Sequence, residues 1–99
     1  MDKRRKPLTP HEQLQVRLAL PITISEHPEW QFAHIARYVR TTLNLTLQEM
    51  AKVSQLSVPA LIKIEAGASS PSLRTVERLL KPFGLRISVV PILRDTLTQ

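Results

Sequence analysis

Side chains that commonly bind metals or carry catalysis are few in this chain and poorly placed for either task. There is no cysteine, so disulfides, thiolate metal sites and cysteine nucleophiles are excluded. His27 and His34 could share one face of a helix, but no third ligand follows at a metal-binding spacing. We therefore predict no metal site.

Motifs for nucleophilic catalysis or phosphate binding are also missing from the sequence. The serines Ser69, Ser70 and Ser72 have no obvious histidine or lysine base. With only Gly67 and Gly84, the chain cannot form a glycine-rich phosphate loop. The sequence predicts no catalytic residue and no cofactor, so we do not expect an enzyme.

The charge of the chain favours a polyanionic partner such as nucleic acid. The formal net charge is +6. Residues 2–6 contribute half of this excess, so the rest of the chain is only mildly basic. This basic N-terminal arm could follow a phosphate backbone or enter a minor groove, or it could be a solvated terminus.

Length and hydropathy describe one small domain. The chain has 99 residues, of which 42% are hydrophobic, which gives a modest core and makes a dimer plausible. No run approaches the roughly 20 apolar residues of a membrane span, and the N-terminus lacks the apolar segment of a signal peptide. We expect a cytoplasmic protein with no membrane partner.

Two patterns compete in residues 10–24. Thr9, Pro10 and Glu12 form a helix-start pattern, which predicts a helix over residues 10–20 that ends at Pro21. Apolar residues at every second position from Leu14 to Ile24 instead have the period of a half-buried strand. We predict a helix followed by a short extended stretch.

The next segment has one clear period. Pro28 is well placed to open a helix, and apolar residues at three- and four-residue steps from Phe32 predict a long amphipathic helix that runs to about Leu43. Asn44 can end this helix. Trp30 and Tyr38 could stack on a partner or pack in the core.

Residues 45–67 predict two short helices on either side of a tight turn. Thr46 and Glu49 form a capping box for the first helix. Ser57 can cap the second helix, and Gly67 suits a left-handed position after its end. This arrangement is typical of a helix-turn-helix that lays its second helix in a DNA groove.

A further helix and a strand are expected after this unit. Ser72 can cap a helix with an apolar stripe that ends near Lys81. Residues 85–91 are rich in isoleucine and valine, which predicts a strand. A single strand is not stable alone. Its partner would be the same strand of a second subunit or the stretch 14–24.

From about Ile35 to Leu85 the chain resembles the XRE or phage-repressor (Cro-type) helix-turn-helix family. The positions that carry the resemblance are spread over the unit: Leu45, Thr46, Gln48, Glu49, Met50, Ala51, Leu56, Ser57, Leu61, Ile64, Glu65, Gly67, Pro71, Ser72 and Leu73. The strand after the last helix is similar to HipB-type antitoxins, which are homodimeric repressors that also hold a toxin kinase.

The resemblance implies roles for individual residues. Arg40 and Glu65 would form a buried ion pair that is structural. Thr46, Gln48 and Lys52 would lie beside DNA phosphates, although Thr46 and Gln48 could equally be a cap and a solvated face. The positions that would face the DNA bases, to which we add Ser69 in the following linker, are Ser57, Val58, Pro59, Ala60, Ile62 and Lys63.

These base-facing positions are unusually apolar for the family. Only Ser57 and Lys63 have side chains that can form hydrogen bonds. Val58 or Ala60 could contact thymine methyl groups, and specificity would otherwise depend on DNA shape. The alternative is that Val58, Pro59 and Ile62 form an apolar patch that contacts protein.

The expectations can now be stated together. We predict a mainly α, lambda-repressor-like fold of four to five helices: an arm and N-terminal extension over residues 1–27, a helix-turn-helix domain over 28–84, a dimerisation strand over 85–93 with Leu85, Ile87 and Val89 in the interface, and a polar tail over 94–99.

The function that the resemblance implies is that of a homodimeric repressor on a palindromic operator, with the antitoxin role and a HipA-like toxin kinase as partner. The alternatives are a protein-interaction module that neutralises a toxin with weak or lost DNA binding, and a phage-type regulator with no toxin. The face of the last helix that carries Arg74 and Arg78 could meet DNA phosphates or an acidic toxin surface, or be solvated.

Overall fold

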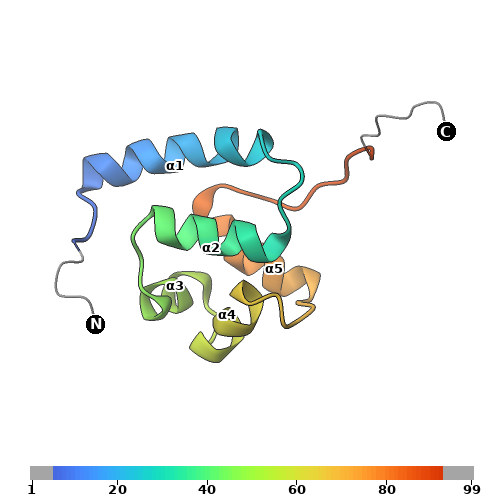
Figure 1. The fold of residues 1–99 in the computed structure, drawn as a ribbon. Coiled ribbons are helices and arrows are strands. Elements are labelled where there is room, and N and C mark those ends of the chain that lie inside the picture. The colour runs from blue at the N-terminus through green and yellow to red at the C-terminus, as the bar shows by residue number, and fades with distance from the viewer. Residues whose placement is uncertain (1–5, 93–99) are drawn as a thin grey trace.

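Five α-helices and a short 3-10 helix make up the part of the chain that the computed structural model describes, residues 6–92 (Figure 1). The helices are α1 (Pro10–Ser25), α2 (Phe32–Thr42), α3 (Leu47–Ser54), α4 (Val58–Glu65) and α5 (Leu73–Leu80), and α5 continues into the 3-10 helix η1 (Lys81–Phe83). No helix within residues 6–92 is both long and apolar enough to cross a membrane. The basic arm at residues 2–5 and the polar tail at 94–99 lie outside the described residues.

Side-chain caps fix where four of these helices begin. The hydroxyls of Thr9, Thr46, Ser57 and Ser72 each accept a hydrogen bond from a backbone N–H in the first turn of α1, α3, α4 and α5. In α1 and α3 a glutamate also accepts from the capping residue, which completes a capping box. The helix starts predicted at Pro10, after Thr46, after Ser57 and after Ser72 are confirmed.

The core lies between α2, α3, α4 and α5. Its fully buried apolar side chains come from every helix, with several from α2 to α5 and one from α1: Leu20, Ala36, Val39, Leu43, Met50, Ala51, Leu61, Ile64, Leu79, Leu80 and Phe83. Figure 1 shows α1 across the top of α2, with α4 on the other side of the molecule. Helix α2 packs against both α1 and α4.

Helix α1 is longer than predicted. The expected end at Pro21 and the extended stretch after it are wrong, because the helix continues to Ser25 with Pro21 inside it. A proline in a helix removes one backbone hydrogen bond. The helix persists because Leu20 is buried and Val16 and Ile24 pack on the core one turn to either side.

A second contact holds α1 to the end of α5. Arg17 donates a hydrogen bond from Nη1 to the carbonyl oxygen of Pro82 at 2.8 Å. The same guanidinium lies over the ring of Phe83, 5.4 Å from its centroid. These contacts join the N-terminal helix to residues that are more than sixty positions away in the sequence.

Helix α2 begins at Phe32, so the start predicted at Pro28 is wrong. Residues 27–30 form a turn in which the Trp30 N–H donates to the carbonyl oxygen of His27 at 3.0 Å. The His27 ring stacks on Trp30 with centroids 4.3 Å apart, and its Nδ1 lies 3.0 Å from a Glu29 carboxylate oxygen. These side-chain contacts favour the turn over another turn of helix.

The predicted C-terminal strand is absent from residues 85–92, and no strand occurs elsewhere in the described residues. Leu85 is half-buried, whereas Val89 is 96% exposed and Ile87 is 37% exposed. A strand requires a neighbour for its N–H and C=O groups. Residues 14–24 cannot be that neighbour because they are helical.

Candidate nucleic-acid interface

The turn between α3 and α4 sets the angle at which α4 is presented. Gln55 adopts a left-handed conformation with φ of 58°, and the Leu56 N–H donates to the Ala51 carbonyl at 3.0 Å, closing α3. Ser57 then accepts from the Ala60 N–H at 3.1 Å and starts α4. Two short helices are therefore joined by a turn in which both ends are hydrogen-bonded.

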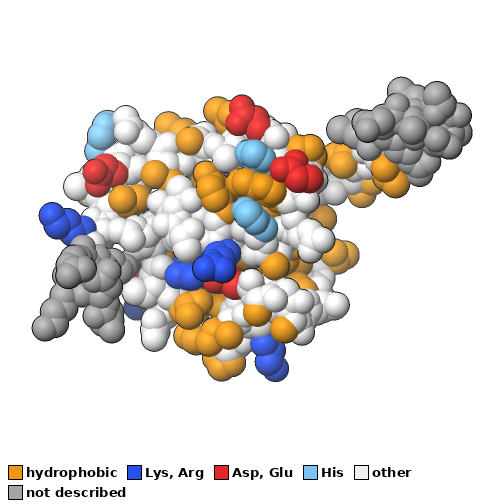
Figure 2. Space-filling view, viewed as in Figure 1, with side chains coloured by type: hydrophobic (Ala, Val, Ile, Leu, Met, Phe, Trp, Pro, Cys, Tyr) orange, Lys and Arg blue, Asp and Glu red, His pale blue; other side chains and the backbone are white. Residues whose placement is uncertain are grey.

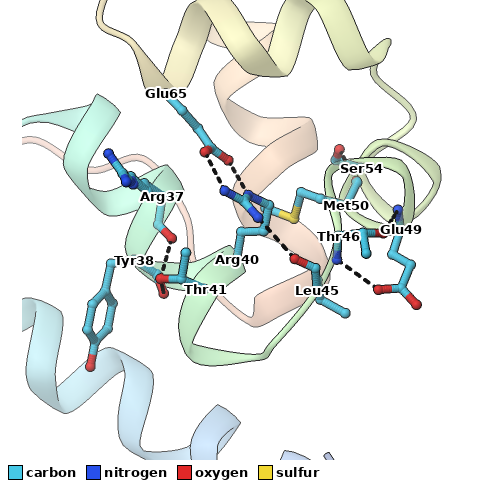
Figure 3. A network of polar contacts seen from close by, with 10 residues as sticks. All are labelled: Arg37, Tyr38, Arg40, Thr41, Leu45, Thr46, Glu49, Met50, Ser54 and Glu65. Atoms are coloured by element: carbon cyan, nitrogen blue, oxygen red, sulfur yellow. Dashed lines mark hydrogen bonds and ion pairs between the residues drawn. The ribbon is translucent and has the colours of Figure 1, made fainter. Parts of the chain in front are cut away.

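An ion pair between α2 and the end of α4 holds this unit together (Figure 3). Arg40 donates from Nε and Nη2 to the two carboxylate oxygens of Glu65, at 2.7 and 2.9 Å. Its Nη1 also donates to the Leu45 carbonyl at 3.1 Å, just before α3. One guanidinium thus connects α2, the start of α3 and α4.

The surroundings of this pair keep both groups ionised. Only 19% of the Arg40 side chain and 10% of the Glu65 side chain are exposed. The hydrogen bonds to Glu65 raise the pKa of Arg40 above its usual value. Neither group has a role in a reaction, and the geometry is that of a structural clamp.

The residues predicted to face phosphates lie along α3. Thr46 is the N-cap, where its hydroxyl accepts from the Glu49 N–H at 3.0 Å. Gln48 and Lys52 follow on α3 with exposed side chains. The first turn of α3 therefore presents backbone N–H groups and an amide side chain at the same end, which is an arrangement that suits an anion.

A shallow groove of about 350 Å³ runs between α4 and the linker that leads to α5. It brings together most of the residues predicted to face DNA: Ser57, Pro59, Ala60, Lys63 and Ser69. Val58 does not line the groove, and its half-buried side chain packs on the core. Ile62 is 50% exposed on the same helix.

Two residues in this groove were missed by the sequence analysis. Pro71 and Thr75 line its α5 side. The Ser72 cap gave a usable signal for Thr75, because a residue three positions after a cap lies in the first helical turn, close to the preceding linker. Which side of that turn faces α4 depends on tertiary packing.

Hydrophobic side chains are exposed on two sides of the molecule in Figure 2, over α1 and over the α3–α4 end. The second of these regions contains the α4 groove, where Lys63 is exposed beside apolar Pro59. The groove surface is therefore mixed, with one cationic side chain and several small apolar contacts.

The histidines belong to a stack of rings. Trp30 lies between His27 and His34, 4.3 Å from the centroid of each, and 5.0 Å from Tyr38, which packs on the core. The Glu29 pKa is lowered, first by a backbone hydrogen bond and then by the contact with His27. Within residues 6–92, no three His, Cys, Asp or Glu side chains are grouped to hold a metal.

Residues 37–90 match the helix-turn-helix family, in a segment that contains α3, its turn, α4 and α5. The chain belongs to this family. No solved structure shows significant similarity to the chain.

Three curated relatives are named as helix-turn-helix-type transcriptional regulators. One from Methanocaldococcus jannaschii is 36% identical over 59 residues, which is 60% of this chain and 89% of that relative. One from Haemophilus influenzae is 32% identical over 53 residues, 54% of each protein. DdrOP3 from Deinococcus deserti is 35% identical over 51 residues, 52% of this chain. The chain spans 54% and 40% of the length of the last two relatives.

Proposed function

We propose that this chain is a DNA-binding transcriptional regulator that places α4 in the major groove. The observation that carries the proposal is the α4 groove, in which Ser57, Lys63 and Ser69 share one surface at the end of a hydrogen-bonded helix-turn-helix. The names of the relatives, all transcriptional regulators, favour the same function.

Contacts to the DNA backbone would come from α3. The N-terminus of a helix attracts phosphate because its first N–H groups point outward. Gln48 lies in this turn with its amide exposed, and Lys52 is exposed one turn later. These contacts would set the position of α4 without reading sequence.

Reading of bases would depend on few hydrogen bonds. Lys63 can donate to guanine, and Ser57 can donate or accept although its oxygen already caps α4. Pro59 and Ala60 offer only apolar contact, which suits thymine methyl groups. Much of the specificity would then come from DNA shape and from the spacing of two half-sites.

The repressor would act as a homodimer on a palindromic operator, with two α4 helices in major grooves about 34 Å apart. The segment 85–92 is the proposed contact, since Ile87 and Val89 are exposed and its backbone can add a strand to that of a second copy. Leu85 would anchor the start of that strand to the domain.

We also propose that the regulator is an antitoxin that binds a HipA-like kinase. A second groove, of about 440 Å³, supports a protein partner because it is lined by Arg74, Arg78, Lys81 and Arg86 around Leu85, with Glu77 as its only acidic residue. An acidic surface would fit it. Co-purification with a kinase-like protein from the adjacent gene would support this role, and loss of the complex in Arg78→Glu would locate it.

A mobility-shift titration with the DNA upstream of its own gene tests the regulator. Lys63→Ala should weaken binding about 10- to 100-fold, since a good base contact contributes roughly 1–3 kcal/mol. Lys81→Ala is the matched control, because it removes an exposed lysine outside the α4 groove. Absence of any shift by the wild type at about 50 mM salt, where phosphate contacts are strongest, would overturn the proposal.

A further inference from the structure

Helix α1 has a second apolar face that nothing in the described part of the chain covers. Leu14, Leu18 and Ile22 lie four residues apart along it and are 55%, 66% and 62% exposed. They lie on the side of α1 opposite Leu20, which is buried in the core. A surface helix ordinarily has one apolar stripe, so a helix that is apolar on both sides is expected to be covered on both.

We propose that this stripe, Leu14, Leu18 and Ile22, binds the same stripe of a second copy of the chain, with the two α1 helices antiparallel. The stripe is symmetric about Leu18. A twofold axis through Leu18 would bring Leu18 onto its copy and Leu14 onto the copy's Ile22. Such self-complementarity is what a contact between two identical surfaces requires.

The charges along α1 support this occupant and this direction. No charged side chain lies within the stripe or at its exposed neighbours Gln15 and Ala19. In an antiparallel pair, the positive N-terminal end of each α1 lies near the negative C-terminal end of the other, where Glu26 adds further negative charge. A parallel pair would place like ends together.

The position of α1 gives this contact a consequence for DNA, which rests on the proposed function. The stripe points away from α2, and α4 lies on the other side of α2 (Figure 1). Two molecules joined through their stripes would therefore present their α4 surfaces in opposite directions. Such a pair would hold two separate DNA segments, unlike the proposed operator dimer.

Single cysteines test the contact directly, because the chain has none of its own. Leu18→Cys should form an intermolecular disulfide on mild oxidation, whereas Ala19→Cys, exposed on the same helix beside the stripe, should form little. Leu14→Cys alone should also form little, but it should cross-link when mixed with Ile22→Cys. Equal cross-linking by Leu18→Cys and Ala19→Cys, or efficient self-cross-linking by Leu14→Cys, would overturn the proposal.

Sedimentation equilibrium without DNA gives a second readout. Leu18→Glu should lower the concentration-dependent average mass relative to wild type while leaving the circular dichroism spectrum and Tm unchanged, because the side chain is exposed. Gln15→Glu is the control for added charge. An unchanged mass in Leu18→Glu would contradict the stripe as an interface.

The DNA arm separates this inference from the proposed function. With an immobilised duplex and a labelled second duplex, wild type should capture the second duplex and Leu18→Glu should not, although both should shift a single duplex equally. If neither protein binds DNA but Leu18→Cys cross-links as expected, the regulator proposal fails and the α1 contact stands. Capture by Leu18→Glu at the wild-type level would contradict the bridging role.

Discussion

Helix α1 and the unit formed by α2 to α5 use apolar residues in different ways. In the unit, each helix begins at a defined residue and turns buried side chains toward one shared core. In α1, apolar residues lie on both sides, and only Leu20 is fully buried. The comparison shows that a helix can meet every local rule for starting and still depend on a second surface to cover it.

The clamp between α2 and α4 should give the largest effect on stability. Glu65→Ala leaves the Arg40 guanidinium poorly exposed and without its carboxylate partner, so we expect a loss of about 3 kcal/mol in the free energy of unfolding. Urea denaturation measures this loss. Glu77→Ala, which removes an exposed glutamate of α5, should change it by less than about 0.5 kcal/mol. Similar effects of the two substitutions would show that the ion pair does not hold the unit together.

The two faces of α1 should respond differently to truncation. Leu20→Ala creates a cavity at a fully buried position, and we expect a loss of about 2–3 kcal/mol. Leu18→Ala should cost less than about 0.5 kcal/mol when measured in dilute protein, where copies do not associate. If both substitutions cost the same, α1 does not lie on the core as described.

Removing the proline from α1 sharpens the comparison further. Pro21→Ala restores the missing backbone N–H inside the helix, and we expect the free energy of unfolding to rise by roughly 1–3 kcal/mol. Pro28→Ala, in the turn before α2, is the control and should not stabilise. A decrease in stability for Pro21→Ala would indicate that the helix needs the proline.

The smallest effect is expected at the turn of the helix-turn-helix. Gln55 has a positive φ, so Gln55→Gly should stabilise the protein by up to about 1 kcal/mol. Gln15→Gly, inside α1, should destabilise it by about 0.5–1 kcal/mol. Thermal unfolding of both variants gives the comparison, and the same sign for both would contradict the left-handed turn.

Prediction from sequence succeeded where the signals were local. The caps at Thr46, Ser57 and Ser72 and the left-handed Gly67 each depend on a few neighbouring residues, and the structure has all of them. The five residues that share the α4 groove were also named from positions within one unit.

Prediction failed where the outcome depends on distant residues. The end of α1 was misplaced because alternation from Leu14 to Ile24 does not show that both faces belong to one helix. The start of α2 was misplaced because ring stacking between His27 and Trp30 cannot be inferred from helix periodicity. The strand expected at 85–93 needs a neighbour that the described chain does not supply, and Val58 turned toward the core instead of the groove.

The central claim is that α4 and the start of α3 face DNA while the outer face of α1 does not. Amide chemical shifts measured during titration with duplex DNA test it residue by residue. We expect the largest changes at Thr46–Gln48, at Ser57–Lys63 and around Ser69, and little change from Leu14 to Ile22. Changes concentrated on α1, with α4 unaffected, would contradict the account.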